Sequence, residues 1–315
     1  MTIIVTGGAG FIGSNVVNYY LNYRLDEVHV FDNFSSGSKN NLDLNHDRLF
    51  LHEIDLKNSS INWPQIQSNK IYHFAANADV RGGEFNREID FEENVCVTKN
   101  ICDYSKKNSI PKVVFSSSAT VYGEPDIFPT PESYLGHQTS VYGASKLSGE
   151  AYLQSYSEYG DFISVIFRFV SWTGNGYSHG VIYDFVKKLI NDPYKLEILG
   201  NGKQTKSYLD VIDGVKGVIN ISDMVKSKSE IFNLGHEEKM EVIDLAKIVC
   251  EEMGLKKVDF SFSGGERGWK GDSPLVHLDT TKAKNYGWHP KISIENSIRR
   301  TVRYLMEDES KLFRV

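Results

Sequence analysis

Cysteine is scarce in this chain of 315 residues. The three cysteines, Cys96, Cys102 and Cys250, include no C-x-x-C pair, and a sparse, odd set of this kind makes no disulfide framework. We therefore expect three free thiols and a reducing compartment.

Long apolar runs and an excess of basic residues are also missing. No apolar stretch approaches the roughly 20 residues that span a bilayer. The chain runs from Met1-Thr2 straight into Ile3-Ile4-Val5, which leaves no room for a signal peptide. Acidic residues outnumber basic ones, 41 to 35, so the overall charge offers no footprint for nucleic acid or anionic lipid. We expect a cytoplasmic protein that binds neither membrane nor nucleic acid, and no metal site.

Short β-rich runs alternate with helical patterns in the first half of the chain. Helical spacing of apolar residues is clear over Phe11–Arg24 and again around Val95–Tyr104. The expected strands are Thr2–Thr6, Glu27–Phe31, Leu49–Ile54, Lys70–Phe74, Lys112–Ser116 and Phe162–Arg168. This alternation predicts an α/β fold with a doubly wound parallel sheet that helices cover on both faces.

The pattern changes after Arg168. A Gly-rich segment, residues 173–180, is followed by short strands and by helical patterns at Val181–Ile190, Val242–Met253 and Ile292–Met306. We therefore expect a first domain of residues 1–170 and a smaller C-terminal α/β domain of residues 171–315. Parts of residues 206–234 are expected to return to the first domain.

Three glycines follow the first expected strand and open the first helix. In Thr6–Gly13, Gly7 permits a tight turn, Gly10 lets the backbone approach a pyrophosphate, and Gly13 lets helix and strand pack closely. The helix N-terminus then offers unpaired N–H groups and a partial positive charge to phosphates. This spacing and context predict a dinucleotide site.

Asp32 ends the second expected strand, about where an acidic residue binds the adenosine ribose in such sites. A carboxylate accepts hydrogen bonds from a 2′-hydroxyl and repels a 2′-phosphate. Asp32 therefore favours NAD over NADP as the cofactor.

Two further segments carry groups suited to catalysis. A serine-rich run, residues 115–123, ends the fifth expected strand, where parallel sheets bind ligands. Tyr142 and Lys146 are spaced i, i+4, so they share one face of the next helix. A free phenol has a pKa of about 10 and is a poor base at neutral pH. A nearby ammonium and a positive nicotinamide would favour the phenolate.

These motifs together resemble the extended short-chain dehydrogenases/reductases, specifically the NAD-dependent epimerase/dehydratase family, and most closely the UDP-glucose (UDP-galactose) 4-epimerases. The segments that carry the resemblance run nearly end to end: Thr6–Ser14, Phe31–Asn33, Phe115–Glu124, Tyr142–Lys146, His179–Phe185, Leu199–Tyr208, Arg267–Asp272 and Tyr286–Pro290. The resemblance implies a Rossmann fold, a UDP-sugar substrate and a homodimer built from helices around Val95–Tyr104 and Ala144–Tyr156.

The resemblance also implies roles for individual residues. Ser118 would hold the sugar O4, Tyr142 would act as the base, and Lys146 would orient the nicotinamide ribose. Besides Gly7, Gly10, Gly13, Asp32, Tyr142 and Lys146, the implied cofactor contacts are Phe11, Ile12, Asn33, Ser36, Asp55, Leu56, Phe74, Ala75, Ala76, Asn94, Ser116 and Phe169. Besides Ser118 and Tyr142, the implied substrate contacts are Thr120, Ser171, Gly180, Val181, Lys206, Arg267, Asp272 and Val276.

Within the substrate set, Lys206 and Arg267 would hold the pyrophosphate and Asp272 the uridine ribose. The chain departs from the family at three points. Ser171 stands where asparagine is frequent, Lys206 stands where arginine is usual, and the Arg267–Asp272 spacing is longer. Lysine at position 206 replaces a bidentate fork by a point charge.

The residues after Ser118 discriminate between reactions of the family. Sugar 4,6-dehydratases carry an acidic residue there, whereas this chain has Ala119 and Thr120. We therefore expect 4-epimerisation of UDP-glucose and UDP-galactose. Two alternatives stay open: a 4-epimerase of another nucleotide sugar, such as UDP-glucuronate or UDP-N-acetylglucosamine, and a non-catalytic NAD-binding sensor. Val276 occupies a position where a small residue is associated with accepting N-acetyl sugars.

Overall fold

A seven-stranded parallel sheet organises the first part of the molecule. The computed structural model describes residues 1–58, 63–269, 272–307 and 311–312. The strand order is β11-β6-β5-β4-β1-β2-β3, and every neighbouring pair is parallel. The strands are β1 (Thr2–Thr6), β2 (Glu27–Asp32), β3 (Leu49–Glu53), β4 (Lys70–His73), β5 (Lys112–Ser118), β6 (Ile163–Phe169) and β11 (Ser229–Leu234). The predicted fold class is confirmed, and the six expected strands end within two residues of their predicted bounds.

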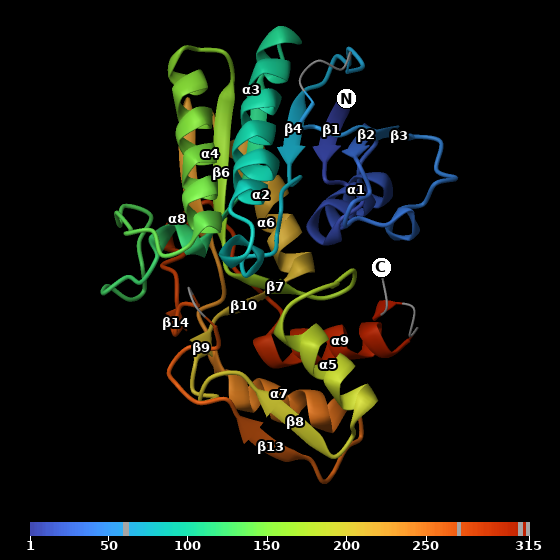
Figure 1. Cartoon of the computed structure of the whole chain (residues 1–315). Helices are drawn as coiled ribbons and strands as arrows, with labels where there is room; N and C mark the ends of the chain where they lie inside the picture. The colour runs from blue at the N-terminus through green and yellow to red at the C-terminus, as the bar shows by residue number, and fades with distance from the viewer. Residues whose placement is uncertain (59–62, 270–271, 308–310, 313–315) are drawn as a thin grey trace.

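Helices cover both faces of this sheet (Figure 1). On one face, α3 (Val97–Lys107) and α4 (Val141–Glu158) pack Ile101 and Leu153 against the sheet. On the other face, α1 (Phe11–Tyr23) and α6 (Val211–Met224) bury a separate apolar cluster that contains their valines. Both faces are therefore apolar, as doubly wound sheets require.

Irregular helical turns precede α3. After η2 (Gly82–Glu84) and the short α2 (Glu88–Asp90), residues Phe91–Cys96 form a π-helical turn. Such turns are rare and concentrate at functional sites. This one carries the buried Asn94.

The C-terminal part has its own apolar core. Here α5 (Val181–Asn191), α7 (Val242–Glu252) and α9 (Ile294–Met306) pack together below the carboxyl ends of the sheet strands (Figure 1). Short strands form three small sheets: β13 (Asp259–Phe262) with β8 (Lys195–Ile198); β12 (Met240–Glu241), β9 (Thr205–Lys206) and β14 (Leu275–Val276); and β10 (Tyr208–Asp210) with β7 (Ser171–Thr173). The remaining elements are η1 (Lys39–Asn41), η4 (Ala119–Tyr122) and α8 (Thr281–Asn285).

The chain crosses between the two parts more than once. After β10, α6 packs on α1 and β11 pairs with β6, so this segment lies on the larger sheet. In contrast, β9 stays in the three-stranded sheet of the C-terminal part. Residues from both parts therefore border the carboxyl edge of the large sheet.

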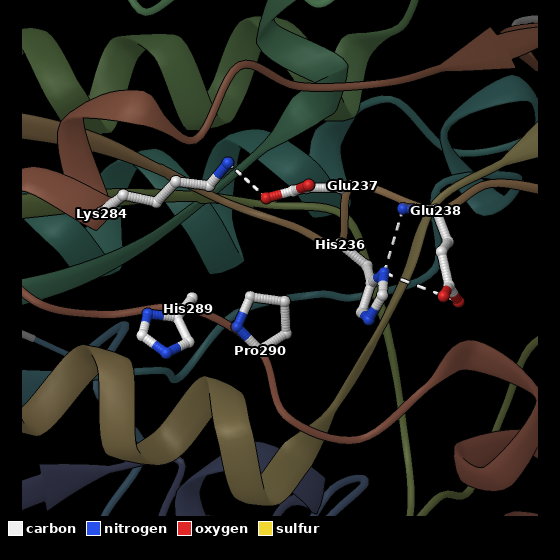
Figure 2. Close-up of a pocket in the computed structure, with 6 residues that line it drawn as sticks. All are labelled: His236, Glu237, Glu238, Lys284, His289 and Pro290. Atoms are coloured by element: carbon white, nitrogen blue, oxygen red, sulfur yellow. Dashed lines mark hydrogen bonds and ion pairs between the residues drawn. The ribbon is translucent and has the colours of Figure 1, made fainter.

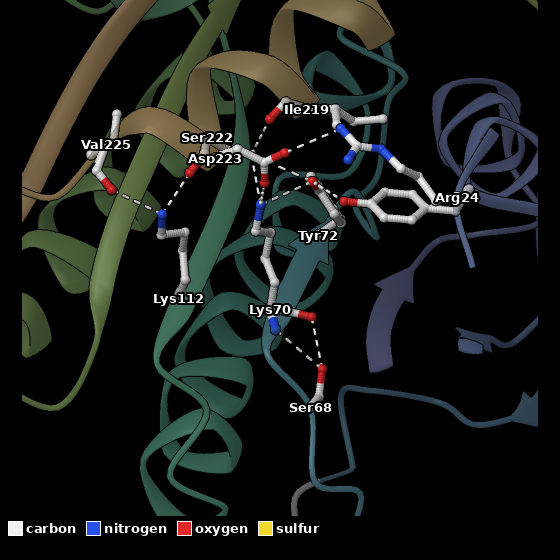
Figure 3. A network of polar contacts seen from close by, with 10 residues as sticks. Arg24, Ser68, Lys70, Tyr72, Lys112, Ile219, Ser222, Asp223 and Val225 are labelled. Carbon is white, nitrogen blue, oxygen red and sulfur yellow. Dashed lines mark hydrogen bonds and ion pairs between the residues drawn. The ribbon is translucent and has the colours of Figure 1, made fainter. Parts of the chain in front are cut away.

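A polar network ties the C-terminus of α6 to the opposite, amino edge of the sheet (Figure 3). Lys70 Nζ lies 2.5 Å from Asp223 Oδ1 and 3.1 Å from Ser222 Oγ. Lys112 Nζ donates to the carbonyl oxygens of Ser222 and Val225 at 2.6 and 2.9 Å. Lys112 therefore satisfies carbonyl groups that a helix end leaves without partners, and both ammonium groups complement the negative pole of α6.

Within the described ranges, no helix combines the length and apolar character that a bilayer-crossing segment needs.

Candidate active site

The turn between β1 and α1 forms a tight glycine cradle. Gly7 has φ +65°, and a Cβ placed on it would lie 2.7 Å from the backbone nitrogen of Ala75. A Cβ on Gly13 would lie 2.1 Å from the Gly7 carbonyl oxygen. Gly10 is the N-cap of α1 and has no side chain to satisfy the first N–H groups of the helix. The cradle therefore fits a phosphate group at the helix N-terminus.

Asp32 closes the cradle from the end of β2. Its Oδ2 accepts a hydrogen bond from Ala9 N at 2.9 Å, and its Oδ1 accepts one from Phe34 N at 2.8 Å. Burial raises the pKa of the Asp32 carboxyl, while the two N–H groups lower it. Each carboxylate oxygen can still accept a further hydrogen bond, so the geometry fits the ribose hydroxyls of a dinucleotide.

The serines at the end of β5 make contacts with different elements. Ser116 Oγ donates to the carbonyl of His73 at 3.2 Å. Ser118 caps the short η4, and its Oγ accepts hydrogen bonds from the backbone N and the Oγ1 of Thr120 at 3.2 and 3.0 Å. These contacts hold the Ser118 hydroxyl in place at the carboxyl edge of the sheet.

Tyr142 and Lys146 lie on the first turns of α4, which Ser140 caps by accepting from Gly143 N at 3.0 Å. Lys146 Nζ donates to the carbonyl oxygen of Ser116 at 3.0 Å and lies 5.8 Å from the centre of the Tyr142 ring. The structure therefore brings together the three residues expected to catalyse, Ser118, Tyr142 and Lys146.

Burial dominates the proton equilibria of this pair. It lowers the pKa of the Lys146 ammonium to about 8, and the carboxylate of Asp90 acts in the opposite direction. Burial and the same carboxylate raise the pKa of the Tyr142 phenol, whereas a hydrogen bond with Ser118 lowers it. The protein's own groups thus disfavour the phenolate, and a positive nicotinamide ring would act in the opposite direction.

The residues expected to hold the substrate diphosphate and uridine lie on the C-terminal part, and the structure pairs each cation with a carboxylate. Lys206 Nζ lies 2.6 Å from Asp272 Oδ1. Arg267 forms a two-pronged ion pair with Glu124, which follows η4 in the first part of the chain. Lys270 and Gly271, which separate Arg267 from Asp272 in the sequence, lie outside the described residues.

The other expected substrate contacts are spread over three elements. Ser171 is exposed on β7, and Gly180 is the N-cap of α5 directly before Val181. Val276 pairs with Lys206 in the small sheet and lines a narrow cavity that also touches Ala119. Val276 therefore lies near the residues that follow Ser118.

A second cavity, of about 420 Å³, lies elsewhere (Figure 2). It is lined by His236, Glu237, Glu238, Lys284, His289 and Pro290. Lys284 forms an ion pair with Glu237, and His236 Nδ1 accepts a hydrogen bond from Glu238 N at 3.0 Å. None of the residues expected from the sequence to bind cofactor or substrate borders this cavity.

Comparison with known proteins decides the family. The sequence model of the NAD dependent epimerase/dehydratase family matches residues 3–235. The chain belongs to this family. It is therefore an NAD-dependent enzyme of the extended short-chain dehydrogenase/reductase type, and NAD is its cofactor.

Individual relatives match almost the whole chain. A protein of Methanocaldococcus jannaschii named "Putative UDP-glucose 4-epimerase" is 31% identical over 313 residues, covering 96% of this chain and 98% of its own. A UDP-galactose 4-epimerase structure is 34% identical with a TM-score of 0.88, covering 98% and 99% of the two chains. The UDP-glucose 4-epimerase of Thermotoga maritima, solved with UDP-glucose, is 30% identical with a TM-score of 0.87 and the same coverage. Other similar proteins are named UDP-N-acetylglucosamine 4-epimerase and UDP-glucuronic acid decarboxylase.

The remaining residues expected around NAD follow the carboxyl edge of the sheet. Phe11 and Ile12 begin α1, Asn33 and Ser36 follow β2, Asp55 and Leu56 follow β3, Phe74, Ala75 and Ala76 follow β4, Asn94 lies in the π-helical turn, and Phe169 ends β6. Leu56 and Phe169 are buried, with side chains only 4% and 7% exposed. Both therefore also contribute to the core.

Sequence reasoning named Asn94 but missed the buried polar cluster around it, which includes Asp90. Asn94 Oδ1 accepts from Asn77 N at 2.8 Å, and Asn94 Nδ2 donates to Ser145 Oγ at 2.8 Å. Asp90 Oδ1 accepts from Asn77 Nδ2 at 2.9 Å and from Asn94 Nδ2 at 3.2 Å. Asp90 lies in an acidic stretch that is typical of a solvated helix, so no signal in the sequence singles it out.

A buried ion pair between α4 and β6 was also missed. Glu150 lies one turn after Lys146 on α4, and both its oxygens accept from Arg168 on β6, at 2.9 and 2.7 Å. Ser117 Oγ, from the serine run, donates to the same carboxylate at 2.5 Å. The pair therefore ties α4 to the strand end that carries Ser118.

Proposed function

We propose that the chain inverts C4 of a UDP-sugar reversibly, with UDP-glucose and UDP-galactose as substrates. The observation that carries the proposal is the convergence of Ser118, Tyr142 and Lys146 beside the glycine cradle. Relatives that span nearly the whole chain and are named for 4-epimerisation of UDP-glucose or UDP-galactose support it.

Each catalytic residue has a distinct task. The Tyr142 phenolate removes the proton from the sugar 4-hydroxyl and later returns one to the same oxygen, after the sugar has turned. Ser118, which Thr120 holds in place, donates a hydrogen bond to the same sugar oxygen. Lys146, bound to the Ser116 carbonyl, provides a fixed positive charge and holds the nicotinamide ribose. NAD, when bound, supplies reversible hydride transfer at C4.

Simple epimerisation fits the chain better than loss of water. The residues after Ser118 are Ala119 and Thr120, and neither can act as a general acid or base at neutral pH. The buried carboxylate of Asp90 is bound by two amide groups. The buried carboxylate of Glu150 is bound by Arg168 and by the Ser117 hydroxyl. Ala119 and Thr120 therefore offer the 4-keto sugar no acid–base group for loss of water, and the sugar is re-reduced.

The C-terminal part would hold the nucleotide while the sugar turns. Lys206 and Arg267 are the cations for the pyrophosphate, and Asp272 is the acceptor for the uridine ribose. A diphosphate with two negative charges competes with Asp272 for Lys206 and with Glu124 for Arg267. Binding energy gained on the nucleotide thus keeps the free 4-keto sugar in the site.

The direct test is incubation of the purified, NAD-loaded protein with a panel of UDP-sugars, followed by separation and mass analysis of the products. We expect UDP-glucose and UDP-galactose to interconvert without change of mass. Tyr142→Phe should lower kcat by about 10²-fold or more, the usual scale for a positioned acid–base group. Tyr194→Phe, which alters an exposed tyrosine far from the site, is the matched control. Loss of water or carbon dioxide from the product, or no turnover of any sugar, contradicts the proposal.

UDP-N-acetylglucosamine is a second candidate substrate, because Val276 is small and lies beside the narrow cavity near Ala119. A small side chain there leaves room for a bulky substituent at C2.

We further propose a homodimer through α3 and α4. These helices lie side by side on the outer face of the sheet (Figure 1). Phe91, Leu147 and Tyr152 on this face are 54, 36 and 41% exposed, although they are apolar or aromatic. A second copy of the chain would cover them. Light scattering of Leu147→Glu/Tyr152→Glu should report a monomer.

A further inference from the structure

Asp90 is a fully buried carboxylate that the proposed reaction does not use. Its side chain has no solvent exposure, and its Oδ1 accepts hydrogen bonds from two amide groups, those of Asn77 and Asn94. Its Oδ2 is buried too, and no described residue donates a hydrogen bond to it. Gly83 packs against this oxygen so closely that a Cβ there would lie 2.7 Å away. A carboxylate in such a position needs a compensating charge to stay ionised.

The packing sets Asp90 against the first turn of α4, which leads to Tyr142 and Lys146: the Cβ position on Gly83 that lies 2.7 Å from Asp90 Oδ2 lies 3.6 Å from Val141 Cβ. Burial raises the pKa of the Asp90 carboxyl, whereas the hydrogen bond from Asn77 and the charge of Lys146 lower it. Burial lowers the pKa of the Lys146 ammonium to about 8, and the carboxylate of Asp90 acts in the opposite direction. Asp79, on the exposed loop after β4, is the other charged group that acts on Asp90, and it disfavours the ionised form.

The remaining titratable neighbours of the pair are on β4 and α4. Burial and the charge of Lys146 lower the pKa of His73 to about 3, so that imidazole is neutral at working pH. Tyr142 lies on α4, and the proposed reaction moves its proton. Its ionised form, the phenolate, is negatively charged like Asp90. Asp90 therefore acts on both groups that the reaction uses, Lys146 and Tyr142, without touching the serine that holds the sugar.

We propose that Asp90 is a positioning residue that fixes a negative charge beside the first turns of α4 and so acts on both groups that the reaction uses there, Tyr142 and Lys146. Through Asn77 and Asn94 the same carboxylate joins the loop after β4 to the π-helical turn, and Asn94 extends the link to Ser145 on α4.

The sign of the effect follows from the charge. A negative group disfavours loss of a proton from both the ammonium and the phenol, so its removal lowers the pKa of Lys146 and the pKa of Tyr142 together. Asp90→Asn removes the charge but keeps an oxygen that can accept from Asn77 and Asn94. We therefore expect this variant to fold, with both ionisations moved to lower pH.

The first experiment needs no substrate. The phenolate of Tyr142 is followed by ultraviolet difference absorbance in the NAD-loaded protein, with Tyr142→Phe subtracted so that the other tyrosines cancel. In Asp90→Asn we expect the midpoint to fall by about one pH unit, a typical effect of one neighbouring charge. Glu92→Gln, which removes an exposed carboxylate two residues along the chain, is the matched control and should leave the midpoint unchanged.

The second experiment measures kcat against pH and rests on the proposed 4-epimerase activity, whereas the absorbance titration does not. Both limbs of the profile should move to lower pH in Asp90→Asn. Asp90→Ala should move them equally and also lower the thermal midpoint, because it breaks the links to Asn77 and Asn94. An Asp90→Asn titration that coincides with the parent, or an equal displacement in Glu92→Gln, overturns the inference. A lower kcat with an unchanged pH profile would mean that Asp90 has only a structural role, and this result overturns the inference as well.

Discussion

The buried pair of Arg168 and Glu150 offers the sharpest test of how the catalytic helix is held. Their side chains are only 7 and 2% exposed. Arg168 makes two hydrogen bonds to Glu150, donates to the carbonyl of Glu132 at 2.9 Å, and lies 4.7 Å from the Tyr122 ring centre. Arg168→Met keeps most of the apolar stem and leaves the Glu150 carboxylate buried with the hydroxyl of Ser117 as its remaining donor.

We expect Arg168→Met to reduce the free energy of unfolding by about 3–5 kcal/mol, the usual cost of leaving one partner of a buried ion pair uncompensated. With an unfolding entropy of about 2.1 cal/mol/K per residue, this lowers the thermal midpoint by ~5–8 °C if the chain unfolds in one step. Because Glu150 lies one turn from Lys146, we also expect weaker retention of NAD.

The decisive comparison is the double variant Arg168→Met/Glu150→Met. Removing both charges eliminates the uncompensated carboxylate, so the double variant should recover most of the stability that Arg168→Met loses. Urea unfolding followed by circular dichroism gives the free energies. Lys228→Met, which breaks an exposed 3.1 Å pair with Glu158, should change stability by no more than about 0.5 kcal/mol. A double variant as unstable as Arg168→Met refutes the argument, because the cost would then not come from a buried charge.

Three further predictions concern binding. Asp32→Ala should relax the preference for NAD over NADP, measured as the cofactor retained on purification; a parent that already retains NADP equally would show that Asp32 does not read the ribose. Lys206→Ala and Arg267→Ala should each raise the KM for the UDP-sugar and leave NAD retention intact, since each removes a cation for the pyrophosphate. An unchanged affinity for UDP would show that the altered side chain only forms its ion pair with a carboxylate and does not bind the substrate. Val276→Tyr should selectively lower kcat/KM for UDP-N-acetylglucosamine relative to UDP-glucose, and an unchanged ratio would remove Val276 from the sugar pocket.

Local sequence was sufficient for much of the fold and for the centre of the candidate site. The glycine turn was predictable because its backbone geometry, with φ +65° at Gly7 and a 2.1 Å approach at Gly13, admits almost no side chain. Six of the seven strands of the large sheet were predictable because helices cover both of its faces, which favours short apolar runs. The seventh, β11, was expected only as a segment that returns to the first domain. Tyr142 and Lys146 were predictable as a pair because helical spacing alone places them on one face.

The small sheets of the C-terminal part were not assigned from the sequence. Their strands are two to four residues long, and their partners are distant along the chain, as β13 with β8 shows. Strands of this length carry too few residues for an alternating pattern, so tertiary packing selects them.

The sequence by itself determined the features that depend on near neighbours along the chain: the glycine cradle, the parallel strands, the Tyr142–Lys146 face and the order in which they occur. The tertiary structure alone decided which charges meet. Arg267 finds Glu124 across 143 residues, Arg168 finds Glu150 on α4, and Asp90, indistinguishable in the sequence from its acidic neighbours, lies with no solvent exposure against the first turn of α4. The physical reason is that a charge acquires its energetic role from burial and from partners in space, and both are fixed only when the whole chain has packed.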